Sequence, residues 1–270
     1  MDVILLAAGI GSRMKNPSTP KTLIPVDHIP MIVRIMTTLA ESKLLIGRFV
    51  LIVRPEEKTI FEREIVRYLH TDIPIHYITQ EPSDGYGTAA AVQSLFRQDD
   101  PTLISEWNMI LNGDTPLLEA RHLEQLQENI VTNRNDLVLG TIFLGDPSGY
   151  GRVLHNPLRI VEQKEIDALP PEDEVRSIRE VNTGIYLIRK DLFLRIREIE
   201  TCPITDEKKL TDICRFAQDP RCFSGFAHHE IININTPLDR NYAEYILFKK
   251  RQEDVYRSLF TLLRKEMKFP

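Results

Sequence analysis

The stretch that decides the fold reads VILLAAGIGSRM and spans Val3 to Met14. Its continuous apolar run, Val3 to Ala7, is typical of a strand that is buried on both faces of a sheet. Gly9 and Gly11 follow at once, and glycine allows a backbone to approach a ligand closely. Successive backbone N–H groups in such a loop can face the oxygens of a phosphate. The stretch therefore predicts a buried strand that leads into an anion-binding loop.

Outward from this strand, apolar runs and helical periods alternate as far as about Thr132. Strands are predicted at 49–53, 75–79 and 109–111, and helices at 30–45, 58–69, 88–96 and 120–130. This alternation is typical of parallel strands joined by helical crossovers, and such sheets bind ligands at the carboxyl ends of their strands. We therefore expect an α/β fold with a Rossmann-like mixed, mostly parallel sheet flanked by helices.

The second half of the chain has a different pattern. Strands are predicted at 137–143, 152–154, 159–163, 181–188 and 230–234, and one long helix from Leu238 to about Met267. The expected organisation is one domain over residues 1–236, with halves at 1–132 and 133–236, followed by a C-terminal helical extension over 237–270.

Composition narrows the class of protein. The 270 residues include 34 Lys+Arg and 39 Asp+Glu, for a net charge of −5, which argues against a general nucleic-acid or membrane binder. Cys202, Cys214 and Cys222 are odd in number and lack CxxC spacing, so we expect reduced thiols in a cytoplasmic protein. The N-terminal apolar run is too short for a membrane span, and no basic region precedes it as in a signal peptide.

Two basic residues accompany the glycine loop, Arg13 within it and Lys21 after Pro20. A Walker loop would end in Gly-Lys-Ser/Thr and a dinucleotide fingerprint would need a third glycine where Met14 stands, so neither pattern fits. The guanidinium of Arg13 offers a fork of donors to phosphate oxygens, and Lys21 offers a compact charge to a phosphate under attack.

The pattern LAAGxGxRM followed by Pro-Lys resembles the signature of the sugar-nucleotide pyrophosphorylases. Among these it resembles most the uridyltransferase domains of bacterial bifunctional N-acetylglucosamine-1-phosphate uridyltransferases. The resemblance implies a fold of the nucleotide-diphospho-sugar transferase type, with Arg13 and Lys21 as catalytic residues. It also implies that the first loop contacts the nucleotide through Leu6, Ala7, Ala8, Gly9 and Gly11.

A second motif follows the third predicted strand, where Gln80 precedes Gly85-Tyr86-Gly87-Thr88. A primary amide offers both a donor and an acceptor, as the edge of uracil requires. The resemblance implies that Gln80, Gly87 and Thr88 contact the base of the nucleotide.

Asn112-Gly113-Asp114 ends the fourth predicted strand. A carboxylate beside a triphosphate is repulsive unless a cation lies between them, and Mg²⁺ is commonly held by one or two protein oxygens plus substrate phosphates. The resemblance implies Asp114 and Asn235 as ligands of Mg²⁺, with Asn112 and Gly113 in the nucleotide site.

Three motifs of the second half complete the resemblance: SGYGR at 148–152, VEQK at 161–164 and EVNTG at 180–184. Each is a weak signal alone, but all three occur in family order behind the glycine loop. The resemblance implies that Gly151, Glu162 and Asn182 contact the sugar.

The reaction implied by the resemblance joins UTP to N-acetylglucosamine 1-phosphate, releasing pyrophosphate by in-line attack on the α-phosphate. Alternatives are another sugar 1-phosphate or a phospho-alcohol, dTTP or CTP instead of UTP, and a catalytically silent regulatory relative. Since no hexapeptide repeat is present, we expect no β-helix acetyltransferase domain. Oligomer formation through the C-terminal helix stays open.

Other polar clusters have simpler interpretations. His228 and His229 are adjacent, and adjacent residues in strand geometry point to opposite faces, so we expect a structural role instead of a shared metal ion. Lys208-Lys209 and the run 249–251 are expected to be solvated helix charges.

Overall fold

The computed structural model describes residues 1–9, 11, 19–98, 100–130 and 135–266, of which 101 and 259–266 are described by their backbone only. Within this part of the chain, nine strands form one mixed sheet in the order β11-β7-β10-β6-β1-β4-β5, with β8 pairing β10 and β9 pairing β8. Only β10 and β9 run against the other strands, so the predicted mixed, mostly parallel sheet is confirmed.

The strands and helices have the following bounds. The strands of the sheet are β1 Asp2–Leu6, β4 Arg48–Val53, β5 Ile75–Thr79, β6 Trp107–Asn112, β7 Leu137–Phe143, β8 Arg152–Leu154, β9 Arg159–Val161, β10 Glu180–Arg189 and β11 Pro220–Phe223. A small hairpin is formed by β2 Pro25–Val26 and β3 Ile29–Pro30. The helices are α1 Met31–Ala40, α2 Lys58–Tyr68, α3 Thr88–Gln93, α4 Ala120–Glu128, α5 Gln163–Asp167, α6 Lys190–Leu194 and α7 Pro237–Glu266.

Strand β1 lies at the centre of the sheet and is covered on both faces. Val3 and Leu5 belong to one hydrophobic cluster, and Ile4, which points the opposite way, belongs to another. All three side chains are fully buried, as the continuous apolar run predicted. Parallel strands need crossover connections, which place helices on both faces and so explain why this strand lacks an alternation of apolar and polar residues.

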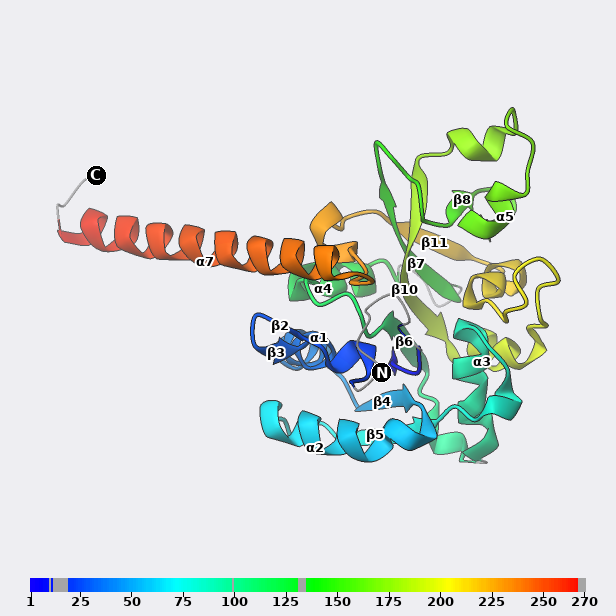
Figure 1. Ribbon diagram of the computed structural model, residues 1–270, viewed down its shortest axis with the longest axis horizontal. Coiled ribbons are helices and arrows are strands. Elements are labelled where there is room, and N and C mark those ends of the chain that lie inside the picture. Colours follow the sequence, from blue (N-terminus) through cyan, green and yellow to red (C-terminus); the bar gives the residue numbers. More distant parts are fainter. Residues whose placement is uncertain (10, 12–18, 99, 131–134, 267–270) are drawn as a thin grey trace.

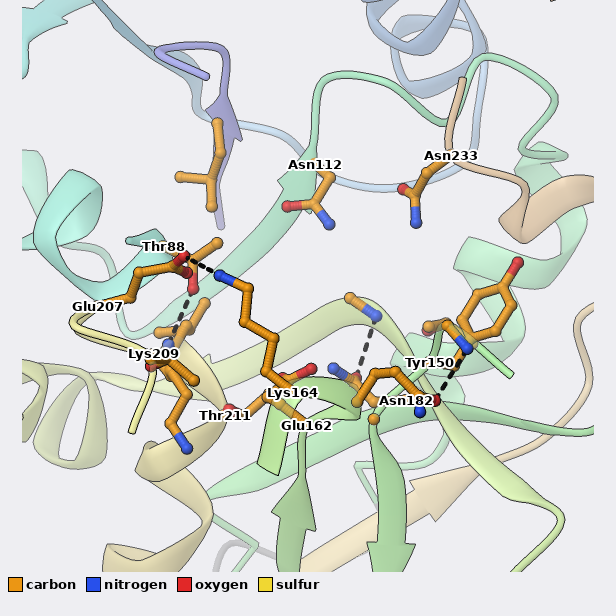
Figure 2. Close-up of a pocket in the computed structure, with 18 of the residues that line it drawn as sticks. Thr88, Asn112, Tyr150, Glu162, Lys164, Asn182, Glu207, Lys209, Thr211 and Asn233 are labelled. Atoms are coloured by element: carbon orange, nitrogen blue, oxygen red, sulfur yellow. Dashed lines mark hydrogen bonds and ion pairs between the residues drawn. The ribbon is translucent and has the colours of Figure 1, made fainter. Parts of the chain in front are cut away.

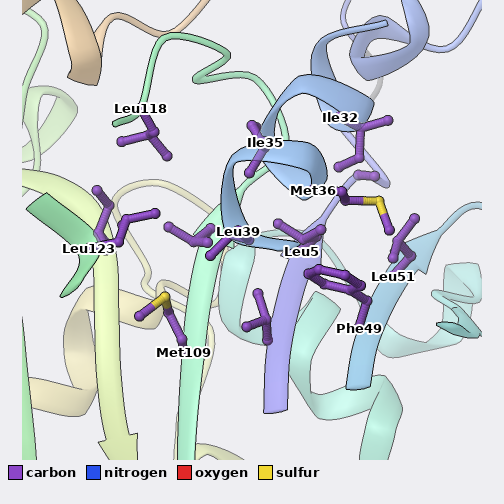
Figure 3. Packing of buried hydrophobic residues seen from close by; sticks show 14 of the residues in the cluster. Leu5, Ile32, Ile35, Met36, Leu39, Phe49, Leu51, Met109, Leu118 and Leu123 are labelled. Carbon is purple, nitrogen blue, oxygen red and sulfur yellow. The ribbon is translucent and has the colours of Figure 1, made fainter. Parts of the chain in front are cut away.

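The two helical layers follow from the spacing of apolar residues. In α1, Ile32, Ile35, Met36 and Leu39 form one side of the helix and pack on the sheet. Figure 3 shows this side of α1 above Leu5 of β1 and Phe49 of β4. Residues of α2 and α4 join the same cluster, whereas residues of α3 and α6 pack on the opposite face of the sheet. Figure 1 shows α2 and α3 on either side of the sheet. Parallel pairing of β1 with β6 then sets Leu6 opposite Asn112, so both strands end at one edge of the sheet.

Several sequence predictions differ from the structure. The strand expected at 230–234 is wrong, because residues His228–Ile231 form a 3-10 helix. The reason lies in Glu230, whose fully buried carboxylate accepts hydrogen bonds from the backbone N–H groups of Ala227 (2.7 Å) and Glu119 (2.9 Å). These bonds hold the segment as a turn. Strand β11, which pairs parallel to β7, and the hairpin β2-β3 were not predicted.

Some element bounds also change. Helix α1 ends at Ala40, not Leu45, and α3 continues beyond Gln93 as a 3-10 helix, Ser94–Gln98. The strand expected at 159–163 ends at Val161, because Gln163 begins α5.

The long C-terminal helix is confirmed as α7, which begins at Pro237 and projects from the body of the protein (Figure 1). Its first turns are anchored, since Ala243 is fully buried together with Ile234 and packs with Ile246 and Leu247. Farther along, Val255 and Tyr256 are exposed. Oligomer formation through this helix stays a prediction.

Two expectations concern membranes and thiols. Among the described residues, no helix combines the length and the apolar character that crossing a bilayer requires. Cys202, Cys214 and Cys222 are all free thiols in the structure.

Candidate active site

Two adjoining cavities open at the carboxyl ends of β1 and β6. The first, of about 560 Å³, is lined by the glycine loop and is called the loop cavity. The second, of about 480 Å³, is lined by β10 and by the residues around β8 and β9, and is called the strand cavity. Leu6, Thr88, Asn112 and Glu207 line both cavities, so the two spaces meet at the edge of the sheet. The site therefore has room for two ligands side by side.

Lys21 lines the loop cavity and connects segments that are far apart in the sequence. Its Nζ donates to Asp114 Oδ2 in a short ion pair and to Asn235 Oδ1 at 2.8 Å. Asn235 is brought there by the preceding residue, because Ile234 N donates to the backbone oxygen of Asp114 at 2.9 Å. The side chains of Lys21 and Asp114 are only 11% and 17% exposed, so this charge pair is largely shielded from water. Three residues named from the sequence thus form one contact.

The donor set around Asp114 fits a hard divalent cation. Asp114 Oδ1 is buried and has no hydrogen-bond partner among the described residues. Together with Asn235 Oδ1 it offers a carboxylate and an amide oxygen, the ligand types that Mg²⁺ accepts. A buried oxygen without a donor is costly, and a cation at this place would satisfy it. The expected ligands Asp114 and Asn235 therefore fit magnesium by their chemistry, although Lys21 contacts both.

The glycine loop approaches the site as its sequence suggested, as far as the structure describes it. Gly9 and Gly11 line the loop cavity, with Leu6 and Ala8 beside them. Gly11 has φ +63°, and a Cβ at this position would lie 2.6 Å from Cβ of Lys21, so a side chain here is excluded by both strain and contact. Ala7 is buried under the loop and its N donates to the oxygen of Ile52. Arg13 lies outside the described residues.

The second nucleotide motif lines the same cavity. Gln80 lines this cavity, and its Nε2 donates to the backbone oxygen of Gly85 at 2.9 Å. The side-chain oxygen of Gln80 can therefore accept a hydrogen bond from a ligand. Gly87 has φ +109° and packs against the backbone of Lys208, so glycine is required there. Thr88 Oγ1 accepts from Leu210 N at 2.9 Å while its hydroxyl hydrogen stays available. Gly113 N donates to Leu6 O at 2.9 Å, which ties the ends of β1 and β6 together.

The three residues expected at the sugar line the strand cavity together. Gly151, Glu162 and Asn182 all contribute to its wall, and Figure 2 shows Glu162 and Asn182 below Asn112 and Asn233. Asn182 is fixed by its own contacts, because Oδ1 accepts from Gly184 N at 3.0 Å and Nδ2 donates to the hydroxyl of Tyr186 at 2.9 Å. It therefore keeps one N–H for a ligand.

The ionised form of Glu162 is disfavoured in the wall of the strand cavity, because the carboxyl is buried there. Burial raises the pKa of its carboxyl above the ordinary value of 4.5, and the neighbouring Thr211 hydroxyl and Lys209 charge only partly oppose this. The folded chain therefore resists ionisation of Glu162 more than the unfolded chain does. The stability contribution of this group is fully present below its ordinary pKa and is lost as the pH rises through the raised pKa.

We accordingly expect Glu162→Gln to raise the midpoint of thermal unfolding near neutral pH, because glutamine does not ionise. The gain should shrink as the pH falls through 4.5, because below this value wild-type Glu162 is protonated in both states. Thermal unfolding of both proteins over a pH series tests this, with the exposed Glu172→Gln as the control. A gain of the same size at every pH would contradict the prediction.

Several residues that line the two cavities were not predicted from the sequence. Asn233, Tyr186 and Thr211 line the strand cavity, and Arg54 lines the loop cavity. Asn233 stands two residues before Asn235, so an alternation of asparagines in IININTP could have pointed to it. Arg54 is ion-paired with Glu57 and directly follows β4. Because β4 ends at the same edge of the sheet as β1, its end could have been searched for site residues in the sequence.

The expectation of solvated helix charges is wrong for Lys208 and Lys209, and in the run 249–251 it holds for the exposed Lys249 but not for the half-buried Lys250. Lys208 and Lys209 are not solvated helix charges: Lys208 Nζ donates to Gln93 Oε1 at 2.8 Å, and Lys209 is buried against Glu165 at 2.7 Å. They precede the 3-10 helix Leu210–Phe216, and Lys209 lines the strand cavity. In the run 249–251, Lys250 pairs with Glu119 and Arg251 with Asp27, so these residues join α7 to the domain.

The histidines expected to be structural are not on a strand. His229 lies in the 3-10 helix, with its Nε2 3.7 Å from Glu119 Oε1. Their predicted structural role was based on the opposite directions of adjacent side chains on a strand. That premise is wrong, because both histidines lie in a 3-10 helix.

Comparison with known proteins agrees with this arrangement. Residues 3–179 match the family model described as the MobA-like NTP transferase domain. The bifunctional protein GlmU of Desulfotalea psychrophila is 31% identical over 266 residues, which cover 94% of this chain and 72% of that protein. The bifunctional protein GlmU of Thermodesulfovibrio yellowstonii is 32% identical over 247 residues, and there the match covers 90% of this chain and 51% of the relative, about half of its length.

Solved structures share the fold. A putative glucose-1-phosphate thymidylyltransferase from Bacillus anthracis, in complex with a sucrose, superposes with a TM-score of 0.65 at 21% identity, covering 91% of this chain and 94% of that one. The inositol-1-phosphate CTP transferase from T. maritima gives a TM-score of 0.61 at 20% identity, covering 88% and 90%. Since the family model spans more than half of the chain, and a curated relative above 30% identity is covered over more than two thirds of its length, this chain belongs to the family of MobA-like NTP transferase domains.

Proposed function

We propose that the chain is a magnesium-dependent nucleotidyltransferase that makes UDP-N-acetylglucosamine and pyrophosphate from UTP and N-acetylglucosamine 1-phosphate. One observation carries the proposal: Lys21 lines the loop cavity, which adjoins the strand cavity, and contacts both Asp114 and Asn235. Two phosphorylated substrates that react with one another need adjoining binding spaces and positive charge close to the reacting phosphates. The choice of substrates is supported by the bifunctional GlmU relatives over most of the chain.

In this proposal the loop cavity holds the nucleoside triphosphate and the strand cavity holds the sugar phosphate. Gly9 and Gly11 allow the triphosphate to approach the backbone, and Gln80 and Thr88 contact the base. Gly151, Glu162 and Asn182 hold the sugar, with the carboxylate of Glu162 accepting from hydroxyl groups. The two cavities meet at Asn112, so the acceptor phosphate and the α-phosphate lie next to each other there.

The chemistry needs alignment and charge neutralisation more than proton transfer. The attacking phosphate oxygen is already an anion, and it forms a bond to the α-phosphorus while the bond to pyrophosphate breaks. Lys21 stabilises the charge on the α-phosphoryl group, and Arg13 is proposed to hold the leaving pyrophosphate. Asp114 and Asn235 would hold Mg²⁺, which when bound supplies positive charge between the phosphates. Lys21 must leave at least part of its contact with Asp114 to reach the α-phosphate.

A substrate panel tests the proposal directly. Pyrophosphate release is measured with UTP, dTTP and CTP against N-acetylglucosamine 1-phosphate, glucose 1-phosphate and a phospho-alcohol, in the presence of Mg²⁺. We expect the highest kcat/KM for UTP with N-acetylglucosamine 1-phosphate. Preference for another pair would replace the substrates but keep the reaction class, whereas no release with any pair would contradict nucleotidyl transfer.

A further inference from the structure

Asn112 and Asn233 are two amides that line the strand cavity, and neither side chain is hydrogen-bonded to another described residue. Asn112 ends β6, and Asn233 lies between the 3-10 helix His228–Ile231 and α7. Figure 2 shows both projecting into the cavity from the same wall, opposite Asn182 and Tyr150. Asn233 Oδ1 is shielded from solvent and has no partner. A buried carbonyl oxygen without a donor costs free energy, so this oxygen is suited to a ligand that donates to it.

The chain path fixes where Asn233 stands relative to the reacting groups. Asn233 and Asn235 flank Ile234, whose side chain is fully buried and whose N donates to Asp114 O at 2.9 Å. Asn235 contacts Lys21, while Asn233 lines the strand cavity. Two residues of chain span at most about 7 Å, so Asn233 lies within that reach of the place where the phosphates meet.

A second contact holds the other amide in place. Asn112 packs against Gly184, which has φ +78°, and a Cβ on Gly184 would come within 2.6 Å of Asn112 Nδ2. The absence of a side chain at Gly184 therefore leaves room for the Asn112 amide beside the cavity. Asn112 also lines both cavities, which places its amide at the junction. The site thus presents an acceptor on Asn233 and donors on Asn112 close to the acceptor phosphate.

The geometry points to Asn233, assisted by Asn112, as a specificity-determining residue that binds an amide substituent on the carbon next to the phosphate-bearing carbon of the sugar. This inference rests on the proposed function. In a sugar 1-phosphate that neighbouring carbon is bonded directly to the anomeric carbon that carries the phosphate. An acetamido group there has one N–H to donate and one carbonyl to accept, which matches Asn233 Oδ1 and the Asn112 NH₂ group. A hydroxyl group at the same carbon would leave one of the two amides less well matched.

The experiment compares N-acetylglucosamine 1-phosphate with glucose 1-phosphate, each with UTP and Mg²⁺, in the wild type and in Asn233→Ala. We expect kcat/KM for the acetamido sugar to fall about tenfold or more, because its N–H loses a buried acceptor. The value for glucose 1-phosphate should change much less, and KM for UTP should stay the same. Asn112→Ala, tested in the same way, should shift the preference in the same direction. The exposed Asn241→Ala serves as the matched control and should behave as the wild type.

The outcomes separate this inference from the proposed function. An equal loss of kcat/KM on both sugar phosphates overturns the role of Asn233 and leaves the proposed function standing. The same conclusion follows if neither asparagine variant loses kcat/KM. If Asn233→Ala fails to fold, as judged by thermal unfolding, Asn112→Ala alone decides by the same ratio. A wild type that prefers glucose 1-phosphate also overturns the inference while keeping nucleotidyl transfer. A wild type that turns over no sugar phosphate overturns both.

Discussion

Lys21→Ala is expected to lower kcat by roughly 10²–10³, the usual cost of losing one preorganised electrostatic contact to the reacting group. In the structure the Lys21 ammonium is the group that joins Asp114 to Asn235, and its side chain is largely shielded from water. A charge in such a place acts on a developing phosphoryl charge with little screening. The measurement is pyrophosphate release at saturating UTP and sugar phosphate.

Two further variants make this result specific. Lys21→Arg keeps a positive charge but not its compact shape, so its kcat should fall between those of the wild type and the alanine variant. The exposed Lys43→Ala changes net charge by the same amount and should leave kcat unchanged. Circular dichroism should show the same fold in all of them. If Lys21→Ala turned over at the wild-type rate, the catalytic role of Lys21 would be excluded.

Asp114→Asn, or removal of divalent cations by EDTA, is expected to abolish most of the turnover. Asp114 Oδ1 is buried without a partner among the described residues and Oδ2 pairs with Lys21, so this carboxylate offers a charged oxygen in the wall of the loop cavity. Replacing it by an amide removes the charge that attracts a hard cation while keeping the shape of the side chain. We expect kcat to fall by roughly 10² or more, on the scale of other lost electrostatic contacts.

A binding measurement distinguishes loss of the cation from loss of shape. Titration with Mn²⁺, a spectroscopically visible substitute for Mg²⁺, should give a much weaker dissociation constant for Asp114→Asn than for the wild type. Asp72→Asn, a change at an exposed carboxylate, should bind as the wild type does. Full activity in EDTA, or unchanged Mn²⁺ affinity in Asp114→Asn, would show that the reaction needs no cation at this carboxylate.

The first half of the fold was largely predictable from the sequence, and the reason is local. Strands β1, β4, β5 and β6 are continuous apolar runs, and the helices between them have apolar residues at helical spacing. Those two periods directly reflect which faces are buried. The position of Asp114 followed from the same rule, since the carboxyl ends of parallel strands meet at one edge and β1 pairs with β6 in parallel.

The second half was less predictable because its short elements are held by distant contacts. Residues 230–234 have an apolar pattern suited to a strand, but the buried Glu230 carboxylate binds two backbone N–H groups and folds the segment as a 3-10 helix. Strand β11 is only four residues long and exists through its pairing with β7. Neither interaction leaves a periodic signal along the chain.

The sequence by itself determined the α/β fold and the segments that form the site, because burial periodicity and glycine at a tight loop are properties of neighbouring residues. It also placed Lys21, Asp114 and Asn235 among the candidates, through the resemblance of their motifs. Only the tertiary structure decided that one ammonium contacts both other side chains, and that Asn233 Oδ1 has no partner among the described residues while Asn233 lines the strand cavity. Hydrogen bonds between residues 93 and 214 positions apart depend on how the whole chain packs, and the presence or absence of a partner is a property of that packing.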